Sequence, residues 1–282
     1  MRASIFSFNS FKNERGIVLA ALIFLSALAW GYTIYLAKTM NCCMFAVQDT
    51  WPFWSAGQFG MMFVMWVVMM VAMMVPTIAP MVLVFVMVNR KRYEQARPYV
   101  PTGFFLLGYL IVWTVFSLVI TFLQEWLQVH ALISTHMILN NQIIQGSILI
   151  LAGIFQWTPL KNKCLTHCRS PFDFILTDWR EGAGGAVMMG LRHGSFCLGC
   201  CWLLMLLLFV GGVMNIVWII LLTVFVLGEK IFPYGRVICR VAGIVFFAWG
   251  VITILVSIGQ PSRQVLTALC QRSLIPHVFV GR

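Results

Sequence analysis

Long apolar runs alternate with short polar segments along almost the whole chain. An α-helix needs about 20 apolar residues to cross the hydrocarbon core of a bilayer. Seven runs approach or exceed that length, at residues 17–36, 60–88, 103–123, 143–157, 186–213, 214–232 and 241–258. We therefore predict an all-α fold, a polytopic transmembrane helical bundle of about six or seven spans.

The first run admits two interpretations, a cleaved signal peptide or an uncleaved anchor. Ala27-Leu28-Ala29 is a passable cleavage site for signal peptidase. The apolar run continues beyond this tripeptide to Leu36. We therefore expect an anchor helix that remains part of the protein.

Basic residues gather in the segments between alternate apolar runs. They cluster within residues 90–97, 161–180 and 230–240, and three more precede the first run. Because positively charged loops stay in the cytoplasm, we predict a multi-pass protein of the cell inner (cytoplasmic) membrane with a cytoplasmic N-terminus. With seven spans, the arginines of the C-terminal tail would lie outside. Either the tail is tolerated there or the number of spans differs by one.

The composition supports a membrane domain and argues against nucleic acid as a partner. Hydrophobic residues make up 61% of the chain and charged residues 10%, whereas soluble domains carry about 25% charged residues. The net charge of +11 comes from clusters that flank apolar runs, a pattern typical of contact with anionic headgroups. We expect the lipid bilayer as a partner and no nucleic acid.

The fifth run carries a concentration of soft metal ligands. Each residue turns a helix by about 100°, so one face holds four potential ligands within an arc of roughly 80°: Met189, His193, Cys197 and Cys200, with Cys201 at its edge. A single cysteine here would be a small packing residue. A histidine and three cysteines within nine residues instead indicate a metal or redox site, with ligands that suit copper(I) or zinc.

The second run carries a stripe of methionines. Seven methionines fall within the fourteen residues 61–74, and Met65, Met69 and Met73 recur at helical spacing. Thioethers select soft ions such as copper(I), so the stripe is a candidate path for an ion in the outer half of the span. Methionine is also an adaptable packing residue, and that interpretation stays open. Pro76 should kink the helix beside the stripe.

A second group of sulfur residues lies in the loop between the fourth and fifth runs. Cys164 and Cys168 bracket His167, a pattern that can hold zinc or copper. Together with Cys197 and Cys200 they would complete a four-ligand site, although the intervening 28 residues exceed the roughly 15–20 of a zinc ribbon. The alternative is a pair of reduced cytosolic thiols. Met40, Cys42, Cys43 and Met44 form a further external group, suited to metal capture or to oxidation.

Two of these segments resemble a known protein family. Residues 65–76, MWVVMMVAMMVP, and residues 189–202, MGLRHGSFCLGCCW, are similar to the signature segments of the bacterial DUF2182 family. These are predicted metal-binding integral membrane proteins, sometimes labelled copper chaperones. The resemblance implies a membrane domain at residues 60–258. An N-terminal anchor helix and external loop at 1–59 precede it, and a C-terminal tail at 259–282 follows it.

We predict from these features a membrane protein that binds a soft metal ion, copper(I) or else zinc, and transfers, chaperones or transports it. His193, Cys197 and Cys200 are the expected ligands, and the partner is a metal donor or acceptor protein. No carboxylate pair, nucleophile elbow or phosphate-binding loop indicates an enzyme. Two alternatives stay open: a membrane thiol–disulfide oxidoreductase that uses Cys197 and Cys200, and a structural zinc site in a protein of other function.

The two sulfur-rich spans should also lie next to each other. Polar groups within a membrane face the interior of a helix bundle rather than lipid. We therefore expect the second and fifth runs to pack together, so that the methionines face His193 and Cys197.

Overall fold

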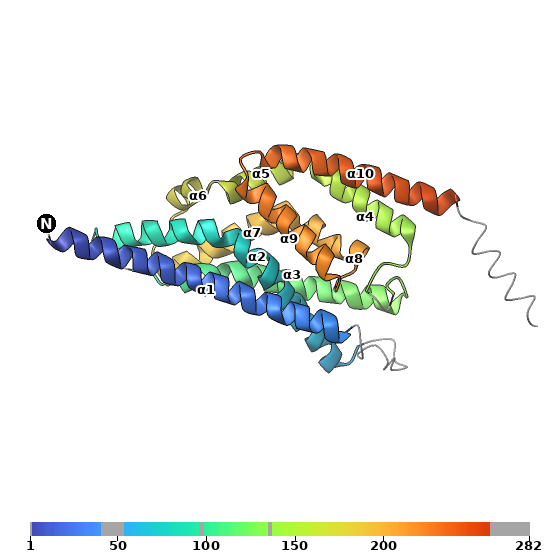
Figure 1. Ribbon diagram of the computed structural model, residues 1–282, viewed down its shortest axis with the longest axis horizontal. Coiled ribbons are helices and arrows are strands. Elements are labelled where there is room, and N and C mark those ends of the chain that lie inside the picture. The colour runs from blue at the N-terminus through green and yellow to red at the C-terminus, as the bar shows by residue number, and fades with distance from the viewer. Residues whose placement is uncertain (1, 41–53, 96–98, 135–136, 260–282) are drawn as a thin grey trace, which may run out of the picture.

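The computed structural model describes residues 2–40, 54–95, 99–134 and 137–259. These ranges form ten helices and contain no β-strand, apart from an isolated antiparallel bridge between Ile133 and Leu139. This confirms the predicted all-α fold. The helices lie alongside one another in an elongated bundle (Figure 1). Their order along the chain is α1 (Arg2–Met40), α2 (Ala56–Tyr93), α3 (Thr102–Val129), α4 (Gln142–Phe155), α5 (Pro159–Arg169), α6 (Pro171–Thr177), α7 (Gly182–Leu206), α8 (Leu208–Gly211), α9 (Ile216–Ile231) and α10 (Gly235–Gly259).

Polar side chains set the starts of several helices. Ser55 and Gln58 form a reciprocal capping box at the start of α2. Thr158 caps α5, in which Pro159 occupies the first turn, and Asn215 caps α9. Short polar residues between apolar runs therefore mark where one helix ends and the next begins.

Five helices are long and apolar enough to cross a membrane, within the described ranges. They are Glu14–Thr39, Ala56–Tyr93, Thr102–Val129, Gly182–Gly211 and Gly235–Gly259. Helices α4 and α5 pass the same test only as a pair, bent by 64°, which would make six spans. The protein is thus a multi-pass membrane protein, and the described ranges hold five or six spans where six or seven were predicted.

The run 214–232 accounts for most of the difference from the prediction. The structure turns it into α9, a helix of 16 residues, which is shorter than the roughly 20 residues of a full span. Asn215 caps its start, and a turn at residues 232–234 ends it. Gly212, with a φ of 96°, separates α9 from α8, because glycine adopts this backbone conformation without steric cost.

The closest helix packing lies between α3 and α7. A Cβ atom on Gly108 would come within 2.1 Å of the Val187 carbonyl oxygen, and one on Gly190 within 2.0 Å of the Phe105 carbonyl oxygen. Small residues allow this approach of two backbones in a membrane. The contact fixes the rotation of α7 and therefore the direction in which its cysteines point.

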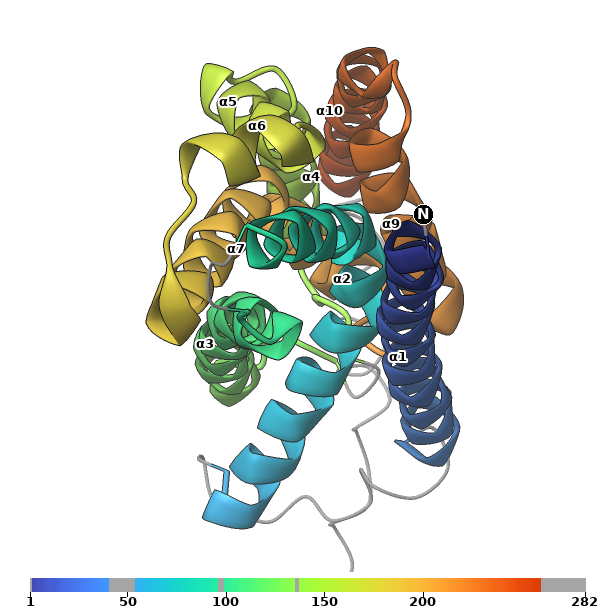
Figure 2. The same cartoon turned by 90° about the vertical axis from the view of Figure 1, so that its left-hand side faces the viewer.

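Helices α2 and α7 do not pack along each other as expected. Helix α2 lies mainly against α1 and α3, whereas α7 lies against α3 and α5. The bulky methionines of α2 keep backbones apart, while the glycines at the α3–α7 contact bring backbones together. Pro76 and Pro80 lie inside α2, and the two halves of this helix run in different directions (Figure 2).

Three segments with charged residues meet at one end of the bundle. Arg90 at the end of α2 forms an ion pair with Glu14 of α1, with an N–O distance of 2.9 Å. Arg92 pairs with Glu181 at 3.6 Å and lies over the Trp179 ring at 4.5 Å. The start of α1, the end of α2 and the α6–α7 connection are therefore at the same end.

Candidate metal centre

Helix α7 turns its candidate ligands into the bundle. His193, Cys197, Cys200 and Cys201 are all buried, and His193 is only 3% exposed. The glycine contacts with α3 lie on the neighbouring face of α7 and hold this orientation. Burial on one helix face agrees with the arc drawn from the sequence.

Cys197 lies among polar groups from three other helices. Lys230 of α9 places its Nζ 3.0 Å from the Cys197 Sγ, and the Tyr109 hydroxyl of α3 lies 3.1 Å from the same sulfur. The Lys230 ammonium also donates to the Thr77 Oγ1 of α2 at 3.1 Å. An adjacent ammonium favours the thiolate form of cysteine, which is the form that binds metals.

Other thiols surround Cys197. The Sγ atoms of Cys200 and Cys201 donate to its carbonyl oxygen at 3.0 and 2.9 Å. Cys168 of α5 lies near the side chains of Cys197 and Cys200, close enough for electrostatic interaction with both. We call these four residues, Cys168, Cys197, Cys200 and Cys201, the thiol cluster.

Cys164 and His167, the other two candidates on α5, differ in their surroundings. Cys164 lies at the edge of the thiol cluster, because a Cβ atom on Gly199 would approach its Sγ to 2.9 Å. His167 is exposed, and its ring stacks on Phe196 with a centroid distance of 4.3 Å. The structure therefore brings Cys164 to the cluster but not His167.

His193 is enclosed by aromatic rings. Phe105, Tyr109 and Phe174 lie with ring centroids 6.2, 6.0 and 5.3 Å from the imidazole. Its Nδ1 is buried and has no hydrogen-bond partner. A buried polar atom without a partner is costly, and a bound ligand would remove that cost.

The match to a protein family bears directly on this site. A family model described as "PpoB2: Copper chaperone" matches residues 63–253, more than half of the chain. The chain belongs to this copper chaperone family. The match confirms the resemblance drawn from the two signature segments, and it includes every residue of the thiol cluster. No curated protein and no solved structure matches the chain significantly.

A copper chaperone must hold its ion with soft ligands and also release it. Across the ranges that the structure describes, no three His, Cys, Asp or Glu side chains are arranged as a ready-made metal site. The donors nevertheless fit a soft cation, because thiolates select copper(I) and the His193 imidazole has a nitrogen without a partner. Cys42 and Cys43 lie outside the described residues.

A buried ion pair lies beside the thiol cluster of this chaperone family member. Lys161 of α5 donates to both carboxylate oxygens of Glu229 of α9 at 2.8 Å, and neither side chain is more than 1% exposed. The Cys239 Sγ of α10 donates to the same carboxylate at 3.1 Å. Glu229 thus holds α9 against α5, the helix that carries Cys168. The next residue, Lys230, contacts Cys197.

The methionine stripe occupies the bundle interior. Met65, Met69 and Met73 are all buried. The stripe ends near Pro76, where the Met74 carbonyl oxygen lies 3.3 Å from the Tyr109 hydroxyl. The inner end of the stripe is therefore connected to Cys197 through a side chain of α3.

Sequence reasoning missed the polar partners of Cys197. Lys230 and Glu229 stand out as charges in an apolar run, but that position equally suits a pair at the membrane edge. Tyr109 and Thr77 carry no signal of their own, since both occur within ordinary apolar helices. Only the packing of α3, α7 and α9 brings Lys230 and Tyr109 to the Cys197 sulfur, and Thr77 of α2 accepts a hydrogen bond from Lys230.

Proposed function

We propose that this protein binds copper(I) at the thiol cluster and passes the ion to or from another protein. The contact between Lys230 and Cys197, surrounded by further cysteines, is the observation that carries the proposal. Structural cysteines in a membrane helix need no buried ammonium beside them. A site for a soft cation benefits from one, because it favours the ligating thiolate.

Charge balance supports copper(I) as the cargo. Two thiolates and one copper(I) ion carry a net charge of −1, which is costly in a membrane interior unless it is compensated. Lys230 supplies a positive charge at 3.0 Å from Cys197. A chaperone site with this balance can hold copper without a large electrostatic penalty.

Cys197 and Cys200 are the proposed central ligands. Cys168 and Cys201 lie near both of these residues, so either can add a third sulfur. His193 lies one turn from Cys197 on α7 and has an imidazole nitrogen without a partner. Zinc, which prefers four ligands in a closed site, is the alternative ion.

We further propose a direction for the ion across the bundle. Met65, Met69 and Met73 would offer weak neutral ligands in the outer half of the membrane, and thiolates would hold the ion further in. Cys164 would exchange it on the cytoplasmic side. His167 would join only if its ring leaves Phe196.

This direction rests on a proposed orientation in the cell inner membrane, with a cytoplasmic N-terminus. Reporter fusions near residues 95 and 135 should give opposite signals, with the first in the cytoplasm. Matching signals would overturn the orientation and the order of ligands that depends on it. The proposed division of the chain into an N-terminal anchor and loop (1–59), a membrane domain (60–258) and a C-terminal tail (259–282) does not depend on that result.

The proximity of Cys168 to Cys197 and Cys200 favours a second candidate function. Three neighbouring thiols from two helices also suit a membrane thiol–disulfide oxidoreductase, in which disulfide partners exchange. Such an enzyme would use the same residues with no bound metal.

Metal analysis of the purified full-length protein separates these functions. Protein from copper-supplemented cells, prepared under reducing conditions, should contain copper bound by thiolates. Zinc alone, tightly held, would instead indicate a structural site. Absence of metal together with a reversible disulfide between α5 and α7 would indicate the oxidoreductase.

A further inference from the structure

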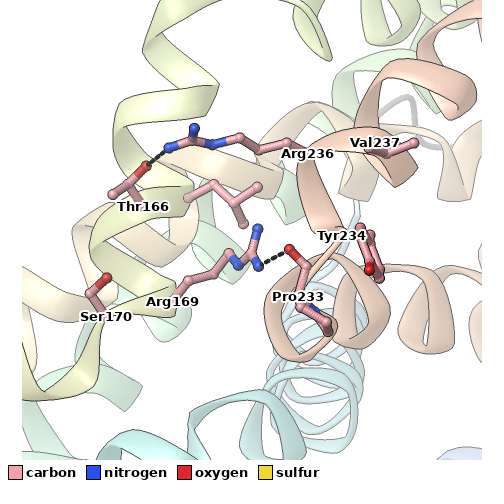
Figure 3. A pocket seen from close by; sticks show the side chains of 8 residues that line it. Thr166, Arg169, Ser170, Pro233, Tyr234, Arg236 and Val237 are labelled. Carbon is pink, nitrogen blue, oxygen red and sulfur yellow. Dashed lines mark hydrogen bonds between the residues drawn. The ribbon is translucent and has the colours of Figure 1, made fainter.

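A cavity of about 350 Å³ opens between α5 and the turn that joins α9 to α10, lined by residues other than those of the thiol cluster (Figure 3). Its polar lining consists of Thr166, Arg169, Ser170, Tyr234 and Arg236, and none of the described Asp or Glu residues lines it. Two arginines from different helices without an acidic residue between them make a site for an anion.

Arg169 is fixed in position by the α9–α10 turn. Its Nη2 donates to the carbonyl oxygens of Phe232 and Pro233 at 2.7 and 2.8 Å. A guanidinium group has five N–H donors, and these two bonds leave others for a ligand. Arg169 is therefore a preorganised donor at one wall of the cavity (Figure 3).

Arg236 forms the opposite wall and is less tightly held. Its Nη2 lies 3.5 Å from the Thr166 hydroxyl, a long hydrogen bond on an exposed side chain. Within the described part of the chain, no carboxylate forms an ion pair with Arg236. Its guanidinium group reaches from α10 toward Thr166 of α5 (Figure 3) and is thus in position to bind a ligand together with Arg169.

The cavity lies where a membrane-spanning helix begins. Helix α10 starts at Gly235 and is one of the five candidate spans. Large apolar side chains continue from the cavity along the exposed side of this helix: Val237 53%, Val241 55% and Ile244 61% exposed. Phe232 and Tyr234 of the preceding turn are exposed as well. A charged cavity that leads into an apolar, outward-facing helix surface matches a headgroup with acyl chains.

We propose that this cavity binds the phosphate of an anionic phospholipid, whose acyl chains follow the exposed face of α10. Arginine forks bind phosphate oxygens in pairs, and basic pockets at the ends of membrane helices take lipid headgroups. An acidic protein would satisfy the arginines but not the adjoining apolar surface. The lipid would tie α5 to the α9–α10 turn, and this inference holds whether or not the thiol cluster binds copper.

Lipid retention by the purified protein tests the proposal. The full-length protein is delipidated in detergent and titrated with phosphatidylglycerol or with neutral phosphatidylcholine, and bound lipid is counted by native mass spectrometry. Arg236→Gln removes the less constrained arginine, while Arg240→Gln removes an exposed arginine one turn further along α10 that does not line the cavity. Arg169 is left unchanged because it also holds the turn.

The parent and Arg240→Gln should retain one phosphatidylglycerol in preference to phosphatidylcholine. Arg236→Gln should weaken retention roughly tenfold, the loss expected for one charge-assisted hydrogen bond. Arg236→Lys keeps the charge but not the forked pair of donors, so its lipid retention should lie between those of the parent and Arg236→Gln. This variant also controls for a folding defect. Equal losses in Arg236→Gln and Arg240→Gln would overturn the proposal, as would equal retention of both lipids. Displacement of the lipid by millimolar inorganic phosphate would show a site for soluble anions instead.

Discussion

Helices α2 and α7 both bury a row of sulfur atoms, but in different surroundings. The methionines Met65, Met69 and Met73 lie in a largely apolar core. Cys197 of α7 lies against an ammonium group and a phenol hydroxyl, next to thiols of its own helix and of α5. One row is compatible with packing alone, and the other is not.

This contrast teaches that the neighbours of a sulfur atom, rather than the number of sulfurs, indicate chemistry. Thioethers are neutral and need no compensating charge in a membrane. Thiolates are charged and must be paired when buried. The buried ion pair of Lys161 and Glu229, beside Lys230, is found with the cysteines and not with the methionines.

The largest effect should follow from breaking that ion pair. Glu229→Leu leaves the Lys161 ammonium buried without its carboxylate, which should lower the free energy of unfolding by about 3–5 kcal/mol. The double variant Lys161→Met/Glu229→Leu removes both charges and should recover much of the loss. Denaturation of the purified protein in detergent measures both changes.

The matched control for Glu229 is a pair at the end of the bundle. Glu14→Leu breaks the more exposed contact with Arg90 and should cost at most about 1 kcal/mol. Similar losses for Glu14→Leu and Glu229→Leu would show that the polar network beside the cysteines has no special role.

A second effect should be seen in copper binding rather than in stability. Lys230→Met removes the ammonium from Cys197, which can then take the neutral thiol form, so the protein should fold but lose most of its copper. Lys163→Met, an exposed lysine of α5, should keep its copper. Copper per protein, measured by mass spectrometry of the metal, distinguishes them. Full copper content in Lys230→Met would show that Lys230 is not needed for copper binding.

The smallest effect should come from the methionine row. Replacement of Met65, Met69 and Met73 by leucine roughly conserves volume, and each change should cost less than about 1.5 kcal/mol. Copper-dependent growth of cells with this variant should nevertheless fall, by less than with Lys230→Met, because weak ligands along the path are lost. Growth equal to the parent in a folded triple variant would show that the row is packing.

Apolar run length was enough to predict the long helices. The runs 60–88 and 103–123 correspond to α2 and α3, since few alternatives bury so many consecutive apolar residues. Apolar run length did not predict that α9 is too short for a full span, because the ends of this helix depend on the cap at Asn215 and the turn after Ile231. Nor could it show that glycines would draw α7 to α3 instead of α2.

The common face of the candidate ligands was predictable where they share one helix. His193, Cys197 and Cys200 follow from helical spacing alone, and all three are buried in the structure. Lys230 and Tyr109 come from other helices, so their contact with Cys197 depends on packing that spacing does not encode.

The central claim is that Cys197 and Cys200 bind copper(I), and the copper content of serine variants tests it most directly. Cys197→Ser and Cys200→Ser are compared with Cys239→Ser. Cys239 is a buried cysteine outside the thiol cluster, and its Sγ donates a hydrogen bond to Glu229. The proposed site predicts that the first two purified proteins lose most of their copper while Cys239→Ser keeps the parent amount. Equal copper content in all three folded variants would contradict it.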